Sequence, residues 1–135
     1  MFLNLLQEEE KYNYLQLAMK AAHINGVFEE EEKKLINAYQ REMNIIGNIT
    51  EYDQQEEIAV FRTFAESELS HKKIVLFELI GFLSSDSDFD DDEKAFVARF
   101  CNETGMSVEN IEIISQSVAK YYSVISEIAE LIFVS

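Results

Sequence analysis

Apolar residues recur along most of this chain at intervals of three and four positions, the spacing of one face of an α-helix. Strict apolar–polar alternation, which would indicate β-strands, is absent from the sequence. The chain has no proline and only four glycines, so residues that break helices are scarce. The apolar stripes predict about six helices, around residues 12–22, 35–46, 58–65, 74–83, 96–100 and 111–132. We therefore expect an all-α fold.

Two of these segments have distinctive patterns. Residues 74–83 (IVLFELIGFL) are apolar on nearly every side, which is typical of a central helix surrounded by others. The last segment has a heptad pattern, formed by Ile111, Ile114, Val118, Tyr121, Ile125, Ile128 and Ile132. A second stripe of Tyr122, Ala129 and Phe133 widens its apolar face. A wide face favours packing on the domain core, and a coiled-coil dimer seam is the alternative.

A motif occurs twice in the chain. Residues 23–36 read HINGVFEEEEKKLI and residues 84–97 read SSDSDFDDDEKAFV, so aromatic, acidic and lysine positions repeat at an offset of 61. Each copy follows an apolar helical run and leads into another. An internal repeat of this kind decides the architecture of a small protein. We predict a single domain over residues 1–135, with two pseudo-symmetric helix–acidic turn–helix units related by an approximate two-fold.

Helix capping explains much of the acidic motif. Asp90 is a good N-cap residue, and Glu93 stands where the acid of a capping box belongs, with Glu29 and Glu32 in the same places in the first unit. The aromatic residue before each cap should pack on the first turn, near the lysine that follows the acids. Acidic side chains also accumulate at helix N-termini because the helix dipole is positive there.

Capping leaves unexplained why six acidic residues crowd into positions 86–93. A hard cation such as Ca²⁺ or Mg²⁺ would relieve their repulsion, and the Asp-x-Asp-x-Asp spacing matches the opening of an EF-hand loop. The remainder of an EF-hand is missing, because Asp91 replaces the required glycine and Val97 the required glutamate. The candidate metal ligands are Asp86, Asp88, Asp90 and Glu93. A solvated, well-capped acidic surface is the commoner outcome of such a run.

The composition restricts the classes of partner. The net charge of −15 argues against nucleic acid and against an anionic membrane surface, and favours cationic proteins, basic peptides or divalent metals. Cys101 is the only cysteine, and neither a signal peptide nor a membrane-spanning apolar run is recognisable, so we expect a cytoplasmic protein. Zinc-binding histidine pairs, phosphate-binding glycine loops and nucleophile elbows are missing from the sequence, so we expect no enzymatic activity and no certain cofactor.

The repeated pattern (Asn/Asp)-(Gly/Ser)-x-Phe-x-x-x-Glu-Lys resembles the TerB-like family, which includes tellurite-resistance TerB and domains of DnaJ-like membrane-bound co-chaperones. The resemblance rests on residues 24–32 and 85–93 and extends over nearly the whole chain. Asn25 replaces the family aspartate in the first unit, and Ser87 replaces the glycine in the second. The resemblance implies an all-helical fold and a role in bacterial stress resistance near the inner membrane, with no known reaction.

These observations predict a non-enzymatic interaction module of a bacterial stress-resistance type, which contacts a cationic partner through its duplicated acidic turns. Besides the candidate metal ligands, the acidic interaction surface would comprise Asn25, Glu29, Glu32, Asp91 and Asp92. The partner would be a protein, and a membrane-associated stress complex is one candidate. We expect no insertion of this chain into the membrane. One alternative is a small Ca²⁺ or Mg²⁺ sensor or buffer. Another is a homodimer built on the C-terminal heptad, so monomer and homodimer both remain open.

Overall fold

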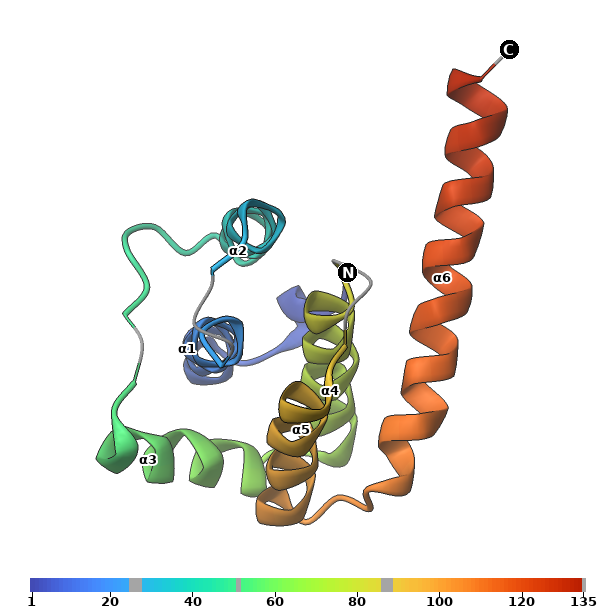
Figure 1. Cartoon of the computed structure of the whole chain (residues 1–135). Helices are drawn as coiled ribbons and strands as arrows, with labels where there is room; N and C mark the ends of the chain where they lie inside the picture. The colour runs from blue at the N-terminus through green and yellow to red at the C-terminus, as the bar shows by residue number, and fades with distance from the viewer. Residues whose placement is uncertain (25–27, 51, 86–88, 135) are drawn as a thin grey trace.

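A computed structural model describes residues 1–24, 28–50, 52–85 and 89–134, and all the regular structure within these ranges is helical. A short 3-10 helix precedes six α-helices in the described chain (Figure 1). The elements are η1 (Leu3–Leu5), α1 (Glu8–Ala22), α2 (Glu30–Met43), α3 (Gln54–Ala65), α4 (Leu69–Leu83), α5 (Asp91–Thr104) and α6 (Glu109–Phe133). The predicted all-α fold of about six helices is confirmed.

The sequence repeat is also a repeat of helices. Both α4 and α5 begin and end 61 positions after α1 and α2, respectively. The second helix of each unit ends at a residue with a left-handed backbone conformation. These residues are Asn44 at φ 57° and Gly105 at φ 80°, again 61 positions apart. The amide after each of these residues donates a 2.9 Å hydrogen bond to a carbonyl of the last helical turns. The two helical hairpins therefore share their lengths and their C-terminal closure.

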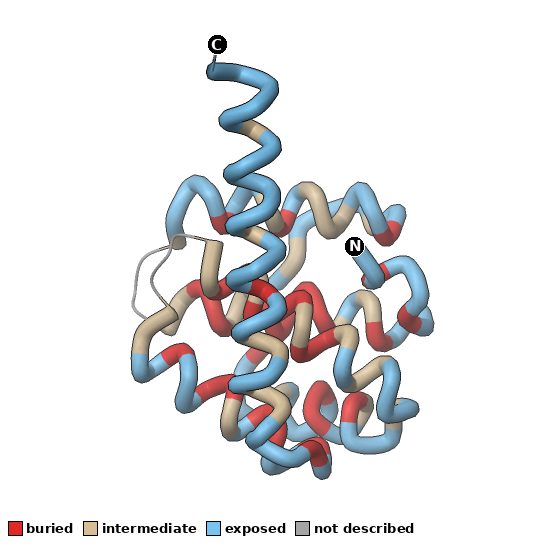
Figure 2. Tube along the Cα trace, turned by 90° about the vertical axis from the view of Figure 1, so that its right-hand side faces the viewer, coloured by how far each residue is buried: buried red, intermediate tan, exposed pale blue. Residues whose placement is uncertain are grey.

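The same helix contacts occur in both halves. Helix α1 packs on α2 and α3, and its counterpart α4 packs on α5 and α6, while α1 and α4 pack on each other. The buried positions in Figure 2 gather where these helices meet. Large side chains that are fully buried there include Tyr14, Leu76, Leu79, Phe82 and Phe100. Cys101 is buried as well, and burial raises the pKa of its thiol to about 11.

Helix α3 packs two phenylalanine rings against α5. The rings of Phe61 and Phe64 lie 6.1 Å and 5.7 Å from the ring of Phe100 on α5, both edge to face. Their burial removes a large apolar area from water, and the edge-to-face geometry is a favourable one for aromatic rings. As a result α3 is held against both α1 and α5.

Helix α6 is only half covered. Its N-terminal half packs on α4, where Val118 is buried and the Tyr122 hydroxyl donates a 2.7 Å hydrogen bond to the Gly81 carbonyl. Its C-terminal half extends past the rest of the molecule in both Figure 1 and Figure 2. At about 1.5 Å per residue, this helix of 25 residues is roughly 15 Å longer than α4, which has 15. Within the described chain α6 packs mainly on α4, and the excess length extends beyond that helix.

The expectation that the C-terminal heptad packs on the core is therefore wrong for its second half. Val118 of the heptad is buried, but Tyr121, Ile125, Ile128 and Ile132 are exposed. The periodicity correctly identified an apolar stripe on a long helix. It contained no information about how far the remainder of the chain reaches along that helix.

Candidate functional site

The acidic turn before α5 forms a reciprocal capping box. The Glu93 amide donates to Asp90 Oδ1 at 2.9 Å, and the Asp90 amide donates to Glu93 Oε1 at 3.0 Å. Glu93 is only 4% exposed. Two backbone amides that α5 leaves without helical partners are thereby satisfied. The predicted capping roles of Asp90 and Glu93 are confirmed.

The turn before α2 repeats part of this arrangement. The Glu29 amide donates to Glu32 Oε1 at 3.1 Å, and Glu32 is 4% exposed, as Glu93 is. The placement of Glu32 on an exposed acidic surface was therefore wrong, because its carboxylate turns inward to bond the backbone. Glu29 is exposed, as are Asp91 and Asp92 in the second turn. Those three residues are the predicted surface acids that the structure leaves open to solvent.

The aromatic residue of each turn lies beside the predicted lysine. Lys33 Nζ is 5.7 Å from the centre of the Phe28 ring, and Lys94 Nζ is 5.8 Å from the centre of the Phe89 ring. Both distances are within the range of a cation–π contact. The two turns thus repeat in three dimensions the order aromatic, cap, acid and lysine that they repeat in sequence.

The metal hypothesis rests mainly on residues outside the described ranges. Asp86 and Asp88, two of the four candidate ligands, are outside them, as is Asn25 of the predicted acidic surface. Within the described part of the chain, no group of three His, Cys, Asp or Glu residues is arranged to hold a metal ion. Asp90 and Glu93 are brought together, but by the capping box. A Ca²⁺ or Mg²⁺ site therefore stays a prediction from the sequence.

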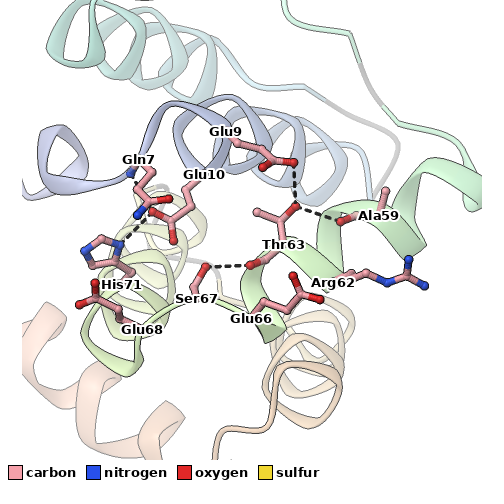
Figure 3. Close-up of a pocket in the computed structure, with 10 residues that line it drawn as sticks. All are labelled: Gln7, Glu9, Glu10, Ala59, Arg62, Thr63, Glu66, Ser67, Glu68 and His71. Carbon is pink, nitrogen blue, oxygen red and sulfur yellow. Dashed lines mark hydrogen bonds and ion pairs between the residues drawn. The ribbon is translucent and has the colours of Figure 1, made fainter.

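A polar pocket of about 400 Å³ opens where α1, α3 and α4 meet (Figure 3). At its edge, Glu10 Oε1 accepts a 2.7 Å hydrogen bond from the Gln7 amide and lies 2.9 Å from His71 Nδ1. Burial alone would raise the pKa of Glu10, but the neighbouring Ser67 hydroxyl, the Gln7 amide and the His71 ring lower it overall. Glu10 is thus a buried carboxylate that the folded protein holds in its charged form.

The hydroxyls of the polar pocket bond backbone carbonyls of α3. The Ser67 hydroxyl donates its proton to the Thr63 carbonyl at 2.8 Å, and the Thr63 hydroxyl donates to the Ala59 carbonyl at 3.1 Å. Figure 3 shows these two bonds along α3, a longer contact of 3.5 Å between the Thr63 hydroxyl and Glu9 Oε1 on α1, and the carboxylate of Glu10 between Ser67 and the His71 ring. The side chains of this pocket therefore join α1 to α3 and α4.

A second hollow, of about 200 Å³, lies between α2 and the middle of α6, over α4. We refer to it as the α2–α6 groove. Its walls are mostly aromatic or aliphatic, and a single carboxylate, that of Glu78, lines it. The groove is lined by Met1, Leu35, Tyr39, Phe77, Glu78, Gly81, Val118, Tyr121 and Tyr122. A mostly apolar hollow with a buried polar group is the usual composition of a binding site.

Glu78 shares a cation with Glu42 at the edge of this groove. The ammonium of Met1 lies 3.0 Å from Glu78 Oε2 and 2.9 Å from Glu42 Oε1. Burial raises the pKa of Glu78 even though the ammonium acts to lower it. Burial also raises the pKa of Tyr39, so this phenol stays protonated beside the carboxylates. Two carboxylates with one ammonium leave an excess of negative charge when both acids are ionised.

The protruding half of α6 presents a run of exposed apolar side chains. We call it the α6 face; it comprises Tyr121, Val124, Ile125, Ile128, Leu131 and Ile132, all exposed. These positions lie on one side of the helix because they follow its period. Scattered exposed apolar side chains are ordinary, but a contiguous set on one helix marks a site of interaction in most proteins.

No family model matches the chain, and no curated protein or solved structure matches it significantly. The TerB-like resemblance therefore remains an expectation drawn from the repeated motif. Among the described helices, none combines the length and the apolar character required to cross a bilayer.

Sequence reasoning missed three features of the structure: the Glu10–His71 pair, the buried Glu78 carboxylate and the exposed α6 face. The Glu10–His71 pair joins residues from different helices, and the sequence contained no signal for it. Glu78 did carry a signal, because it is the only charged residue in the apolar run 74–83. A lone carboxylate inside such a run should be buried and should require a partner. The exposure of the α6 face had no sequence signal, since periodicity does not reveal what covers a stripe.

Proposed function

We propose that this chain is a non-enzymatic interaction module that binds another protein through the C-terminal half of α6. The observation that carries the proposal is the α6 face, where six large apolar side chains on a protruding helix are exposed together. Leaving such side chains in water costs roughly 25 cal/mol for each Å² of apolar surface, so a partner that covers them gains that free energy.

Charge supports a cationic partner. The chain carries a net charge of −15, and the exposed acids at the starts of α2 and α5 add local negative potential. Such a field accelerates the encounter with a positively charged protein and repels acidic ones. The acidic turns thus attract the partner, and the apolar helix holds it. Membership of a bacterial stress-resistance system, as the TerB-like resemblance implies, is part of this proposal, as is a cytoplasmic location.

Photo-cross-linking in the cells that make the protein tests this proposal. A photoreactive phenylalanine analogue at Ile128 lies within the α6 face, and the same analogue at Ser123 lies on the other side of the helix and is also exposed. We expect a discrete cross-linked species from position 128 that is absent from position 123. Equal cross-linking at the two positions, or none at position 128, would contradict the proposal.

A homodimer is the second candidate, and the heptad spacing favours it. The α6 face contains the heptad residues Tyr121, Ile125, Ile128 and Ile132, which are the positions that pair in a coiled coil. Light scattering on the full chain and on Ile128→Glu distinguishes the two. A dimer that this exposed substitution dissociates would assign the face to a second copy. Val118 is unsuitable for the same test because it is buried.

A further inference from the structure

One difference between the two halves of the repeat leaves the α2–α6 groove open. In the first half, α3 packs on α5 with Phe61 against Phe100. The residues 61 positions away are Tyr122 of α6 and Tyr39 of α2, which instead line the groove. Within the described chain, α6 packs on α4 and makes no comparable packing with α2. The α2–α6 groove therefore lies where the helix contact equivalent to α3 with α5 is missing from the described chain.

The next pair of equivalent residues shows the same asymmetry. Phe64 of α3 is fully buried and lies 5.7 Å from the Phe100 ring. Its counterpart 61 positions later is Ile125, which is 45% exposed. The aromatic side chains where α3 meets α5 are thus buried, whereas their equivalents at the α2–α6 groove are half-buried or exposed. Large apolar side chains from outside the chain would cover these equivalents.

The charge beside the groove selects among partners. Glu78 lines the groove and shares the Met1 ammonium with Glu42, so the two carboxylates have one cation between them. Two carboxylates accommodate a second cation, and a charge-assisted hydrogen bond to a buried carboxylate is stronger than one between neutral groups. A lysine or arginine next to apolar side chains therefore complements the groove in both shape and charge.

A second copy of this chain complements the groove poorly. Its own α6 would be the natural apolar helix to supply, but Lys120 is the only basic residue in that helix. Glu127 and Glu130 accompany its exposed half and would approach Glu42 and Glu78. Each copy also carries a net charge of −15, so two copies repel each other electrostatically.

We infer that the α2–α6 groove binds a basic amphipathic helix of a partner protein, with apolar side chains against Tyr39 and Tyr122 and a lysine or arginine at Glu42 and Glu78. This inference rests on the proposed function, because it names the class of partner that the α6 face receives. A helix lying along α6 would cover the α6 face with the same apolar side that enters the groove. Binding of this kind is the helix-in-groove mode of recognition.

Fluorescence anisotropy with designed peptides tests the inference on the full chain. The probe is a labelled amphipathic helix of leucine and lysine, compared with a leucine–glutamate helix of the same pattern and a leucine–lysine peptide of scrambled order. We expect saturable binding of the first peptide and at least about tenfold weaker binding of the other two. Binding of the scrambled peptide with equal affinity would overturn the inference, because net charge alone would then suffice.

Matched substitutions locate the site. Glu42→Gln and Glu30→Gln remove the same charge, but Glu30 lies in the exposed first turn of α2 and pairs with Lys33 at 3.1 Å. Tyr121→Ser removes a groove wall, and Tyr12→Ser removes a ring of similar exposure on α1. We expect Glu42→Gln and Tyr121→Ser each to weaken leucine–lysine peptide binding about fivefold to tenfold, and the two controls to leave it unchanged. Equal effects of a variant and its control would overturn the assignment to the groove.

Two further outcomes separate this inference from the proposed function. If position 128 cross-links to a protein in cells but the leucine–lysine peptide fails to bind, the interaction role stands and the basic-helix assignment fails. If light scattering shows a dimer that Tyr121→Ser dissociates, the occupant is a second copy and the inference is overturned. Circular dichroism of each variant shows whether it is folded, so that a loss of binding can be distinguished from unfolding.

Discussion

His71 Nδ1 lies 2.9 Å from Oε1 of Glu10, and the two residues occupy the same position in the two repeats, 61 positions apart. Each stands in the first turn of its helix, Glu10 in α1 and His71 in α4. Equivalent residues meet in this way only close to the axis that relates the two halves. The contact therefore supports the predicted two-fold, and it makes Glu10 a connection between the halves as well as the capping-box acid of α1.

Glu10 should give the free energy of unfolding a pH dependence of definite sign. Its pKa is lower in the folded protein than the ordinary value of 4.5, so its contribution to stability is present above pH 4.5 and is lost as the pH falls through the folded pKa. We expect the difference in unfolding free energy between the wild type and Glu10→Gln to shrink below pH 4.5. Urea unfolding at a series of pH values measures it, with the exposed capping-box variant Glu56→Gln as the control. The same pH dependence in both variants would refute the role given to Glu10.

Glu78 should show the opposite sign. Because burial raises its pKa above 4.5, the folded state holds the proton more tightly, and the resulting stability is lost as the pH rises through the folded pKa. The Glu78→Gln variant should therefore gain stability relative to the wild type between pH 4.5 and neutrality. Urea unfolding of the two proteins over that interval is the measurement. A relative loss by the variant over the same interval would show that the ion pair with the terminal ammonium outweighs burial.

Asp90 should stabilise α5 as a cap, whether or not a divalent cation is present. Asp90→Ala removes the acceptor for the Glu93 amide, and loss of such a cap costs about 1 kcal/mol. We expect the same loss in EDTA and in millimolar Ca²⁺ or Mg²⁺ at matched ionic strength, measured by thermal unfolding. Asp92→Ala is the control, because it removes an exposed first-turn acid and should cost only a few tenths of a kcal/mol.

The metal hypothesis makes the contrary prediction for the same experiment. A saturable, ion-specific rise in the unfolding temperature of the wild type that Asp90→Ala abolishes would establish a cation site at this turn. It would also identify Asp90 as one ligand of that site.

Phe64 and Ile125 form a matched pair for testing the asymmetry of the repeat. They are equivalent in sequence, but Phe64 is fully buried, whereas Ile125 is exposed. Phe64→Ala should lower the free energy of unfolding by about 3–5 kcal/mol, the usual cost of removing a buried phenylalanine. Ile125→Ala should change it by no more than about 0.5 kcal/mol, as exposed positions usually do. Comparable losses at the two sites would mean that α6 is covered along its whole length.

Much of the fold was predictable from the sequence because it depends on local rules. The offset of 61 between the motifs fixes the equivalence of the helices, and the capping residues fix where α2 and α5 begin. Asp90 and Glu93 bond as the capping-box spacing predicts, because both partners lie within one turn of helix. The Phe–Lys contacts of the two turns follow from the same short-range geometry.

The features that were not predictable depend on what lies opposite a side chain. Glu32 was predicted both as the capping-box acid of the first unit and as part of the acidic interaction surface. The capping bond turns its carboxylate inward, so the first prediction is confirmed and the second is wrong. The heptad of α6 predicted packing on the core, because periodicity identifies an apolar stripe but does not show whether another helix covers it. Glu78 and Glu42 come together through the Met1 ammonium, a contact between segments far apart in the sequence.

Hydrogen–deuterium exchange of the isolated full chain tests the central claim, that the C-terminal half of α6 is uncovered in this chain. Amides of residues 124–133 should exchange much faster than those of residues 111–122 in the same helix, because the latter segment contains Val118, which is buried, and Tyr122, which bonds Gly81 of α4. The leucine–lysine helix should then slow exchange selectively in residues 124–133. Uniformly slow exchange along the whole of α6, in a sample that light scattering shows to be monomeric, would contradict the account.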